Sequence, residues 1–279
     1  MVYLVKCGVE WLLGVEGKLS EISEECVRAY LEGRVSVGEL VGVRGAERFL
    51  SDDAALAAPL LEQEIWGAGV TYARSQAARV SESQGSASLY DKVYVAERPH
   101  LFFKGLAWKA GGHRDYVGFR ADSSWSVPEP ELTLVISPQG KVIGLTLGND
   151  ATARDIEASN PLYLSQVKIY EHSACFGPRM LIFDNPPDWR NWTIEMEIER
   201  AGERIFQGAV SLGQLRRSWD ELVSWLYRFQ DFPHGAVLLT GTGIVPPDWY
   251  SMREGDLIKI HCEPLGTLVN YARQINSKK

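Results

Sequence analysis

Residues 125–150 read Trp-Ser-Val-Pro-Glu-Pro-Glu-Leu-Thr-Leu-Val-Ile-Ser-Pro-Gln-Gly-Lys-Val-Ile-Gly-Leu-Thr-Leu-Gly-Asn-Asp, and they are the most informative segment about the fold. Two apolar runs flank a turn sequence at residues 138–141, and together they predict an antiparallel hairpin. With Gln139 and Gly140 as the two central turn residues, the numbers of opposed residues sum to 279. This register sets Asp150 directly opposite Glu129.

Three acidic side chains share one face of the predicted hairpin. Glu129 and Glu131 stand two apart on one strand, so their side chains point the same way, and Asp150 returns from the other strand. Converging like charges are destabilising, so three carboxylates in an apolar strand pair must take up protons or a cation. A hard divalent cation resolves this. Mg²⁺ suits the site because it needs few carboxylates, although ligand type alone does not exclude Ca²⁺.

The competing interpretation is that these acidic residues are solvated on an edge strand. Two features favour the metal site instead. Pro128 and Pro130 flank Glu129 and exclude it from a regular central strand, and Asp150 returns in register with it. The sequence therefore predicts Glu129, Glu131 and Asp150 as metal ligands.

Composition narrows the class of protein. The chain has 279 residues, 45% of them hydrophobic and 23% charged, as in an ordinary globular protein, and no apolar run reaches the length of a membrane span. A net charge of −7 and the lack of any Lys/Arg-rich run argue against nucleic acid as a partner. The four cysteines show no metal-binding spacing, and the first residues do not resemble a secretory signal. We expect a cytoplasmic protein with a small substrate.

Two regions of different character predict two domains. Residues 1–62 combine a short strand at 3–5 with a helical pattern at 20–31, and we expect a small α/β domain with a structural or oligomer-supporting role. In residues 63–279, short apolar runs such as 92–95 and 193–198 are punctuated by Gly and Pro, which predicts a mainly β body with one helix at 212–229. The predicted fold class is α+β, mainly β, with 63–279 as the catalytic metal-binding domain.

Four motifs together resemble the fumarylacetoacetate hydrolase superfamily, in order and spacing from about residue 66 to 269. They are Pro128-Glu-Pro-Glu-Leu, the return strand from Val142 through Asn149-Asp-Ala-Thr-Ala-Arg-Asp155, Leu101-Phe-Phe-Lys-Gly, and Leu238-Leu-Thr-Gly-Thr-Gly. The resemblance implies a mixed-β roll as catalytic fold and a Mg²⁺ or Mn²⁺ ion on the three carboxylates. It also implies a homodimer or homotetramer.

The resemblance extends to one branch of that superfamily. Its carbon–carbon bond hydrolases typically carry a His and a Glu three residues apart after a Gly-x-x-Tyr strand end, where this chain has Ser75 and Ala78. By contrast, the stretches 69–75, 120–131 and 158–170 resemble the 2-keto-3-deoxy-D-arabinonate dehydratase branch. This implies a metal-dependent hydro-lyase that removes water from a 2-keto-3-deoxy sugar acid to give 2-oxoglutarate semialdehyde.

Three residues are candidates for proton transfer in such a reaction. Lys168 aligns with a lysine common in the family, and a desolvated lysine near a cation can serve as an acid or base. Lys104 follows the apolar Leu101-Phe-Phe, and binding of the substrate carboxylate is an equal alternative for it. His100 stands where the branch often has an acidic residue and is either a replacement base or a structural histidine.

Further residues are candidates for substrate binding or structural support. The former are Tyr72, Arg74, Ser75 and Thr242. Thr152 and Asp155 match a helix capping box, and Arg154 is expected to pair with a carboxylate. Gly67-Ala-Gly69 lacks the third glycine of a dinucleotide fingerprint and is weak support for any cofactor.

Two other functions remain open from the sequence. One is a hydrolase or decarboxylase of an acylpyruvate-type diketo acid on the same metal, which requires a water-activating residue. The other is a non-catalytic homologue that keeps the metal site. Retention of Lys104 and Lys168 beside the three carboxylates argues against the latter.

Overall fold

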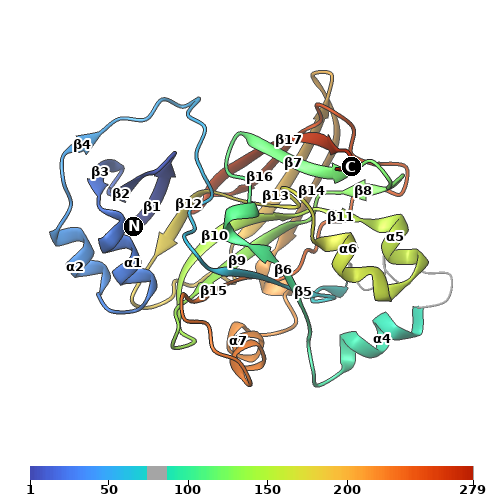
Figure 1. Ribbon diagram of the computed structural model, residues 1–279, viewed down its shortest axis with the longest axis horizontal. Helices are drawn as coiled ribbons and strands as arrows, with labels where there is room; N and C mark the ends of the chain where they lie inside the picture. The colour runs from blue at the N-terminus through green and yellow to red at the C-terminus, as the bar shows by residue number, and fades with distance from the viewer. Residues whose placement is uncertain (74–86, 279) are drawn as a thin grey trace.

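The computed structural model describes residues 1–73 and 87–278, with the side chains of 87–90 left aside. Its main feature is a mixed sheet in which ten strands are described (Figure 1). In spatial order they are β4 (Glu47–Arg48), β3 (Lys18–Ile22), β2 (Glu10–Val15), β1 (Val2–Cys7), β12 (Ala174–Ile182), β10 (Val142–Asp150), β9 (Pro130–Ile136), β15 (Ala236–Leu239), β5 (Glu64–Gly69) and β6 (His100–Leu106). Strand β15 runs parallel to β5, and the other described pairs of this sheet are antiparallel.

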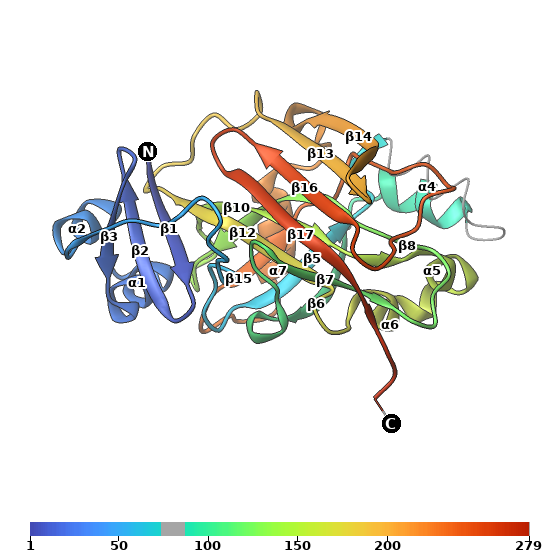
Figure 2. The ribbon, with the colours of Figure 1, turned by 90° about the horizontal axis from the view of Figure 1, so that it is seen from above.

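A second sheet lies across the first, as the view from above shows (Figure 2). Its strands, in spatial order, are β14 (Glu203–Ser211), β13 (Thr193–Arg200), β16 (Leu257–Cys262), β17 (Gly266–Ile275) and β7 (Asp115–Arg120). One apolar core joins the two sheets, with Leu132 and Leu134 of β9 on one side and Ile258 and Ile260 of β16 on the other. The burial of these side chains is the main force that holds the sheets together. A short pair, β8 (Ser126–Val127) with β11 (Thr152–Ala153), completes the described strands.

Six α-helices and three 3₁₀ turns are described. The α-helices are α1 (Glu24–Leu31), α2 (Val37–Gly42), α4 (Ala87–Val95), α5 (Arg154–Ser159), α6 (Leu164–Lys168) and α7 (Trp219–Tyr227), and the 3₁₀ turns are η1 (Ala107–Lys109), η2 (Pro161–Tyr163) and η3 (Leu212–Gln214). The mainly β fold with mixed sheets is therefore confirmed. Within the described ranges, no helix is both long and apolar enough to cross a membrane.

Three local predictions were wrong. The run at 92–95 belongs to helix α4. The helix predicted at 20–31 begins only at Glu24, because Ser23 caps it by accepting from the Cys26 amide. The helix predicted at 212–229 is confined to α7, where Ser218 is the N-cap, and Phe229 is 90% exposed and not part of the buried face.

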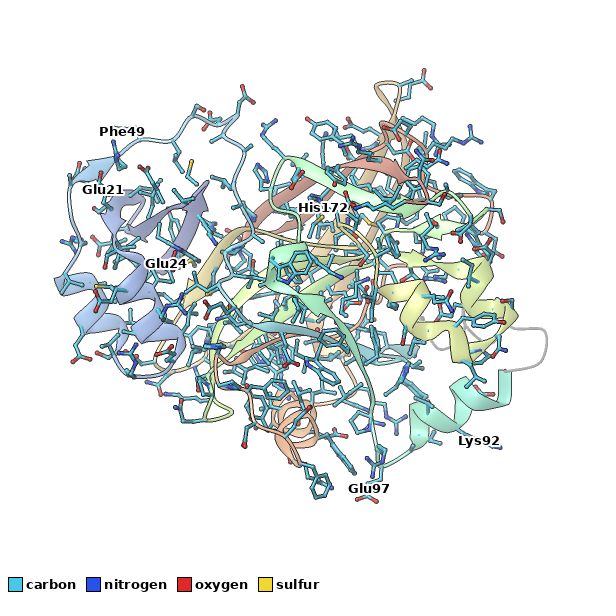
Figure 3. All side chains as sticks on the ribbon, in the orientation of Figure 1. Glu21, Glu24, Phe49, Lys92, Glu97 and His172 are labelled. Atoms are coloured by element: carbon cyan, nitrogen blue, oxygen red, sulfur yellow. The ribbon has the colours of Figure 1, made fainter. Side chains whose placement is uncertain are left out.

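The N-terminal segment continues the large sheet. Strand β1 pairs antiparallel with β12, and the Tyr30 hydroxyl donates to the carbonyl oxygens of Ile143 (2.6 Å) and Phe183 (3.0 Å). Figure 3 labels Glu21, Glu24 and Phe49 on this segment, at the opposite end of the molecule from Lys92 on α4. The division at residues 62 and 63 stays a prediction.

Candidate metal centre and active site

The hairpin formed by β9 and β10 brings three carboxylates together. From Gly144 to Asn149 the numbers of opposed residues sum to 279 as predicted, with Gly148 opposite Glu131, and the amide of Asp150 donates to the carbonyl of Glu129. The prediction was wrong next to the turn, where Val142 pairs with Ile136 and the register shifts by one residue before Gly144. Glu129, Glu131 and Asp150 each offer an oxygen, and these oxygens lie within 4.8 Å of one another. All three residues are buried, with exposed fractions of 3%, 3% and 1%.

Lys168, at the end of α6, is the main cation at this cluster. Its Nζ lies 2.8 Å from Oε2 of Glu129 and 2.7 Å from Oδ2 of Asp150, and it donates to the Thr152 hydroxyl at 2.5 Å. Burial alone would lower the pKa of Lys168, but the charges of Asp150 and Glu129 outweigh burial and raise that pKa above its ordinary value. Lys168 is therefore a protonated donor in this arrangement.

Two further cationic side chains, those of Lys104 and Arg154, contact the carboxylates. Lys104 Nζ lies 2.6 Å from Oδ1 of Asp150 and donates to the Ala151 carbonyl at 3.0 Å. Burial lowers the pKa of Lys104 to about 8, against the opposing effect of Asp150. Arg154 donates to Oε1 of Glu129 at 2.9 Å, as expected for a residue that pairs with a carboxylate.

A β-bulge in the β5–β6 pair determines where the side chain of Lys104 lies. Along the β5–β6 pair the register shifts by one residue between Ile65 and Trp66, which leaves Lys104 as the extra residue of β6. Bulges of this kind redirect a side chain and are common beside functional sites.

The carboxylates fit a divalent cation. Burial and the neighbouring charges of Asp150 and Glu129 raise the pKa of Glu131 well above its ordinary range, although the Gly241 amide donates to its Oε2 at 2.6 Å. A cation held by oxygen ligands would relieve this mutual repulsion, and three carboxylates are the ligand type that Mg²⁺ and Mn²⁺ prefer. The three residues therefore fit the metal that the sequence predicts.

A pocket opens onto the carboxylates. Besides Glu129, Glu131 and Asp150, it is lined by Lys168, His100 and Thr242. The Thr242 hydroxyl contacts the backbone of Ile244, donating at 3.2 Å to the carbonyl and accepting from the amide. The predicted catalytic and binding roles of these residues stay predictions, but the fold does bring these side chains to one cavity.

The other predicted binding residues lie elsewhere. Tyr72 is 3% exposed and packs in the apolar core, and it does not line the described pocket. Burial and the charge of Glu131 raise its pKa. Arg74 and Ser75 lie outside the described residues.

Glu157 and Thr152 lie at the site although neither was predicted as a site residue. Glu157 lines the pocket from α5, three residues after Arg154, a spacing that puts both on one helix face. Thr152 contacts Lys168 instead of capping a helix: α5 has Ala153 as N-cap without a side-chain bond, so the predicted capping box was wrong. Asp155 accepts from Ser123 and Ser124.

The chain is similar to one family model and to several known proteins. The family model described as fumarylacetoacetate (FAA) hydrolase C-terminal matches residues 64–273. The chain is 40% identical over 241 residues to a probable 2-keto-3-deoxyxylonate dehydratase of Haloferax volcanii, covering 85% of this chain and 83% of that protein. It is 33% identical over 259 residues to 2-dehydro-3-deoxy-D-arabinonate dehydratase of Saccharolobus solfataricus, covering 90% and 87%.

A solved structure supports the same grouping. It shows 2-keto-3-deoxy-D-arabinonate dehydratase complexed with magnesium and 2,5-dioxopentanoate, and it matches with a TM-score of 0.81 at 30% identity, over 99% of each chain.

Proposed function

This chain belongs to the fumarylacetoacetate hydrolase family, and on that premise we propose that it is a magnesium-dependent dehydratase of a 2-keto-3-deoxy sugar acid such as 2-keto-3-deoxy-arabinonate. The product is 2-oxoglutarate semialdehyde, which is 2,5-dioxopentanoate. One observation carries the proposal: three buried carboxylates that fit a divalent cation share a pocket with the side chain of Lys168. This pairs a site for a 2-keto acid with a proton donor.

The chemistry requires that a C3 proton leaves and that the C4 hydroxyl departs as water. A Mg²⁺ ion held by Glu129, Glu131 and Asp150 supplies Lewis-acid stabilisation of the charge that develops on the C2 oxygen. This elimination is balanced in protons, because C3 loses one proton and the departing C4 oxygen receives one. A proton shift from C5 to C3 and ketonisation of the resulting enol then give the terminal aldehyde.

The pocket residues divide these proton transfers between them. Lys168 lines the pocket, and its Nζ atom lies 2.7 Å from Oδ2 of Asp150, beside the proposed metal, so we assign it the proton donated to the departing C4 oxygen. His100 also lines the pocket, and we assign it the removal of the C3 proton. Lys104 contacts Asp150 and is fully buried, so its role in this proposal is to hold that carboxylate in place.

The test is incubation of purified protein and Mg²⁺ with 2-keto-3-deoxy-pentonates and, separately, with acylpyruvates. We expect 2-oxoglutarate semialdehyde to form from the pentonates, and proton NMR of the aldehyde group measures its appearance. Pyruvate plus a carboxylic acid from the acylpyruvates would instead identify a carbon–carbon bond hydrolase. Turnover of neither class would leave a metal-binding protein without catalysis.

The proposal extends to assembly, compartment and domain organisation. We place the enzyme in the cytoplasm because its four cysteines are free thiols, which suits a reducing compartment.

We further propose a homodimer or homotetramer, in which a second copy covers exposed aromatic side chains such as Trp108 and Trp249. Light scattering coupled to size exclusion tests this, and a monomer at micromolar concentration would contradict it. Residues 1–62 are proposed as the supporting domain and 63–279 as the catalytic one.

A further inference from the structure

Two glycines at the end of β5 lie directly beneath aromatic rings of β6. The register pairs Gly67 with Phe102 and Gly69 with His100. A Cβ atom on Gly67 would lie 2.5 Å from Cζ of Phe102, and a Cβ atom on Gly69 would lie 2.6 Å from Nδ1 of His100. Real Cβ atoms do not approach other atoms this closely, so each ring occupies the space that only a glycine leaves free.

The Phe102 ring in turn contacts both proposed proton-transfer groups. The Nζ atom of Lys168 lies 5.2 Å from the centroid of this ring, within the range of a cation–π interaction. The rings of His100 and Phe102 lie 5.5 Å apart at an angle of 43°. Gly69, Phe102, His100 and Lys168 all line the pocket that holds the carboxylates.

We propose that Gly67 and Gly69 are positioning residues of the active site. Gly67 leaves room for the Phe102 ring against β5, where that ring supports the ammonium of Lys168. Gly69 leaves room for the imidazole of His100 in the same way. Neither glycine touches the reacting atoms, since each acts through the ring above it. The inference rests on the proposed function in that it takes Lys168 and His100 as the groups that move protons.

The N-terminal part of the sheet contains a matched arrangement that serves as a control. Gly14 of β2 is paired with Tyr3 of β1, and a Cβ atom on Gly14 would overlap the Tyr3 ring. Arg179 lies over that ring at 4.8 Å from its centroid. A glycine, an aromatic ring and a cation are thus stacked in the same way, but none of these residues lines the catalytic pocket.

The experiment compares Gly67→Ala, Gly69→Ala and Gly14→Ala with the wild-type chain. All three variants should lower the melting temperature, because each forces a ring to move. Only Gly67→Ala and Gly69→Ala should lower kcat, by about a hundredfold, since misplacement of a reacting group by about 1 Å has a cost of that order. In Gly69→Ala, proton NMR should show a shift of the His100 ring signal, with the other four histidines unchanged.

A second pair of variants keeps the inference testable if Gly67→Ala does not fold. Phe102→Leu removes the ring, so Gly67→Ala added to Phe102→Leu should cost no further kcat. A further loss of kcat in the double variant, or an equal loss in Gly14→Ala, would overturn the inference, and so would an unmoved His100 signal in Gly69→Ala. Failure of the proposed function is a separate outcome, because it would appear as wild-type protein without dehydratase turnover, while the NMR comparison would still report on the ring.

Discussion

The backbone amide of Asp150 donates a hydrogen bond of 2.9 Å to the carbonyl oxygen of Glu129. This bond extends the β9–β10 ladder by one pair, and it places a carboxylate of each strand on the same face. The two acidic residues are thus held together by backbone geometry rather than by attraction between their side chains, which repel each other. Lys168 bridges them with contacts of 2.8 Å and 2.7 Å.

Replacing Glu129 by Gln together with Asp150 by Asn should abolish metal uptake. Removing a residue that hydrogen-bonds to a metal ligand typically lowers the affinity for the metal by about 10- to 100-fold. Removing two of the ligands themselves should therefore lower the affinity for Mg²⁺ by more than about a hundredfold. Isothermal titration with Mg²⁺, or electron paramagnetic resonance with Mn²⁺, measures this directly. Glu203→Gln, at an exposed position on β14, is the control and should bind as the wild type does. Unchanged metal affinity in the double variant would refute the assignment of ligands.

Lys168→Met should affect catalysis and stability in different ways. Removal of the proposed proton donor should lower kcat by about 10²- to 10⁴-fold. Without metal, the variant should also lose about 1.5–3 kcal/mol of stability, because Glu129 and Asp150 each lose one charged hydrogen-bond partner and keep the other, Arg154 and Lys104. Mg²⁺ should then raise its melting temperature more than it raises that of the wild type.

Thermal melts in EDTA and in excess Mg²⁺ provide the comparison for Lys168→Met. Lys18→Met is a suitable control because the Lys18 side chain is 75% exposed and its ion pair with Glu47 lies on the surface. An equal response of Lys168→Met and the wild type to Mg²⁺ would argue against electrostatic coupling between Lys168 and the metal ligands.

His113 should make the stability of the fold dependent on pH. Its Nδ1 atom accepts a hydrogen bond of 3.2 Å from the Val269 amide, which requires a neutral ring, and burial together with Arg114 lowers the pKa of His113 below 6.5. Above pH 6.5 the ring is neutral in both the folded and the unfolded chain, and its contribution is complete. As the pH falls below 6.5, the unfolded chain takes up the proton first, so that contribution is lost.

Urea unfolding of the wild type and of His113→Gln at pH 7.5 and pH 5.5 measures the effect of His113. The difference in free energy of unfolding between the two proteins should be smaller at pH 5.5. A difference that grows towards low pH would show that the histidine is stabilised in its charged form.

Tyr30→Phe should weaken the attachment of the N-terminal segment without changing the chemistry. It removes a buried hydroxyl that donates to two carbonyl oxygens, those of Ile143 and Phe183, and accepts from the Phe183 amide at 3.0 Å. Leaving buried polar groups unsatisfied costs about 1–3 kcal/mol. Denaturant unfolding should show that loss, and kcat/KM with the pentonate should stay at the wild-type value. A large drop in kcat/KM would mean that residues 1–62 take part in catalysis.

At two positions the sequence pattern did not predict the surroundings of the side chain. Phe229 continues the apolar period of the predicted helix, but the helix ends at Tyr227 and the ring is exposed. Tyr72 stands beside the predicted substrate site in sequence, but its ring turns into the core. The Tyr72 ring packs against strands that are distant in sequence, and periodicity along one segment carries no information about those strands. Phe229 lies beyond the last helical residue, which the apolar period alone does not locate.

The amino-acid sequence was enough to predict the hairpin and the face shared by Glu129, Glu131 and Asp150, because alternation along a strand is a local property. It did not predict the register shift between Val142 and Gly144 beside the turn. The approach of Lys104 and Lys168 to Asp150 from β6 and α6 is visible only in the folded chain. The same holds for the position of Gly67 and Gly69 beneath the rings of Phe102 and His100. Those contacts join segments that are far apart along the chain. Their geometry therefore depends on how the sheet is ordered and packed, which no single segment specifies.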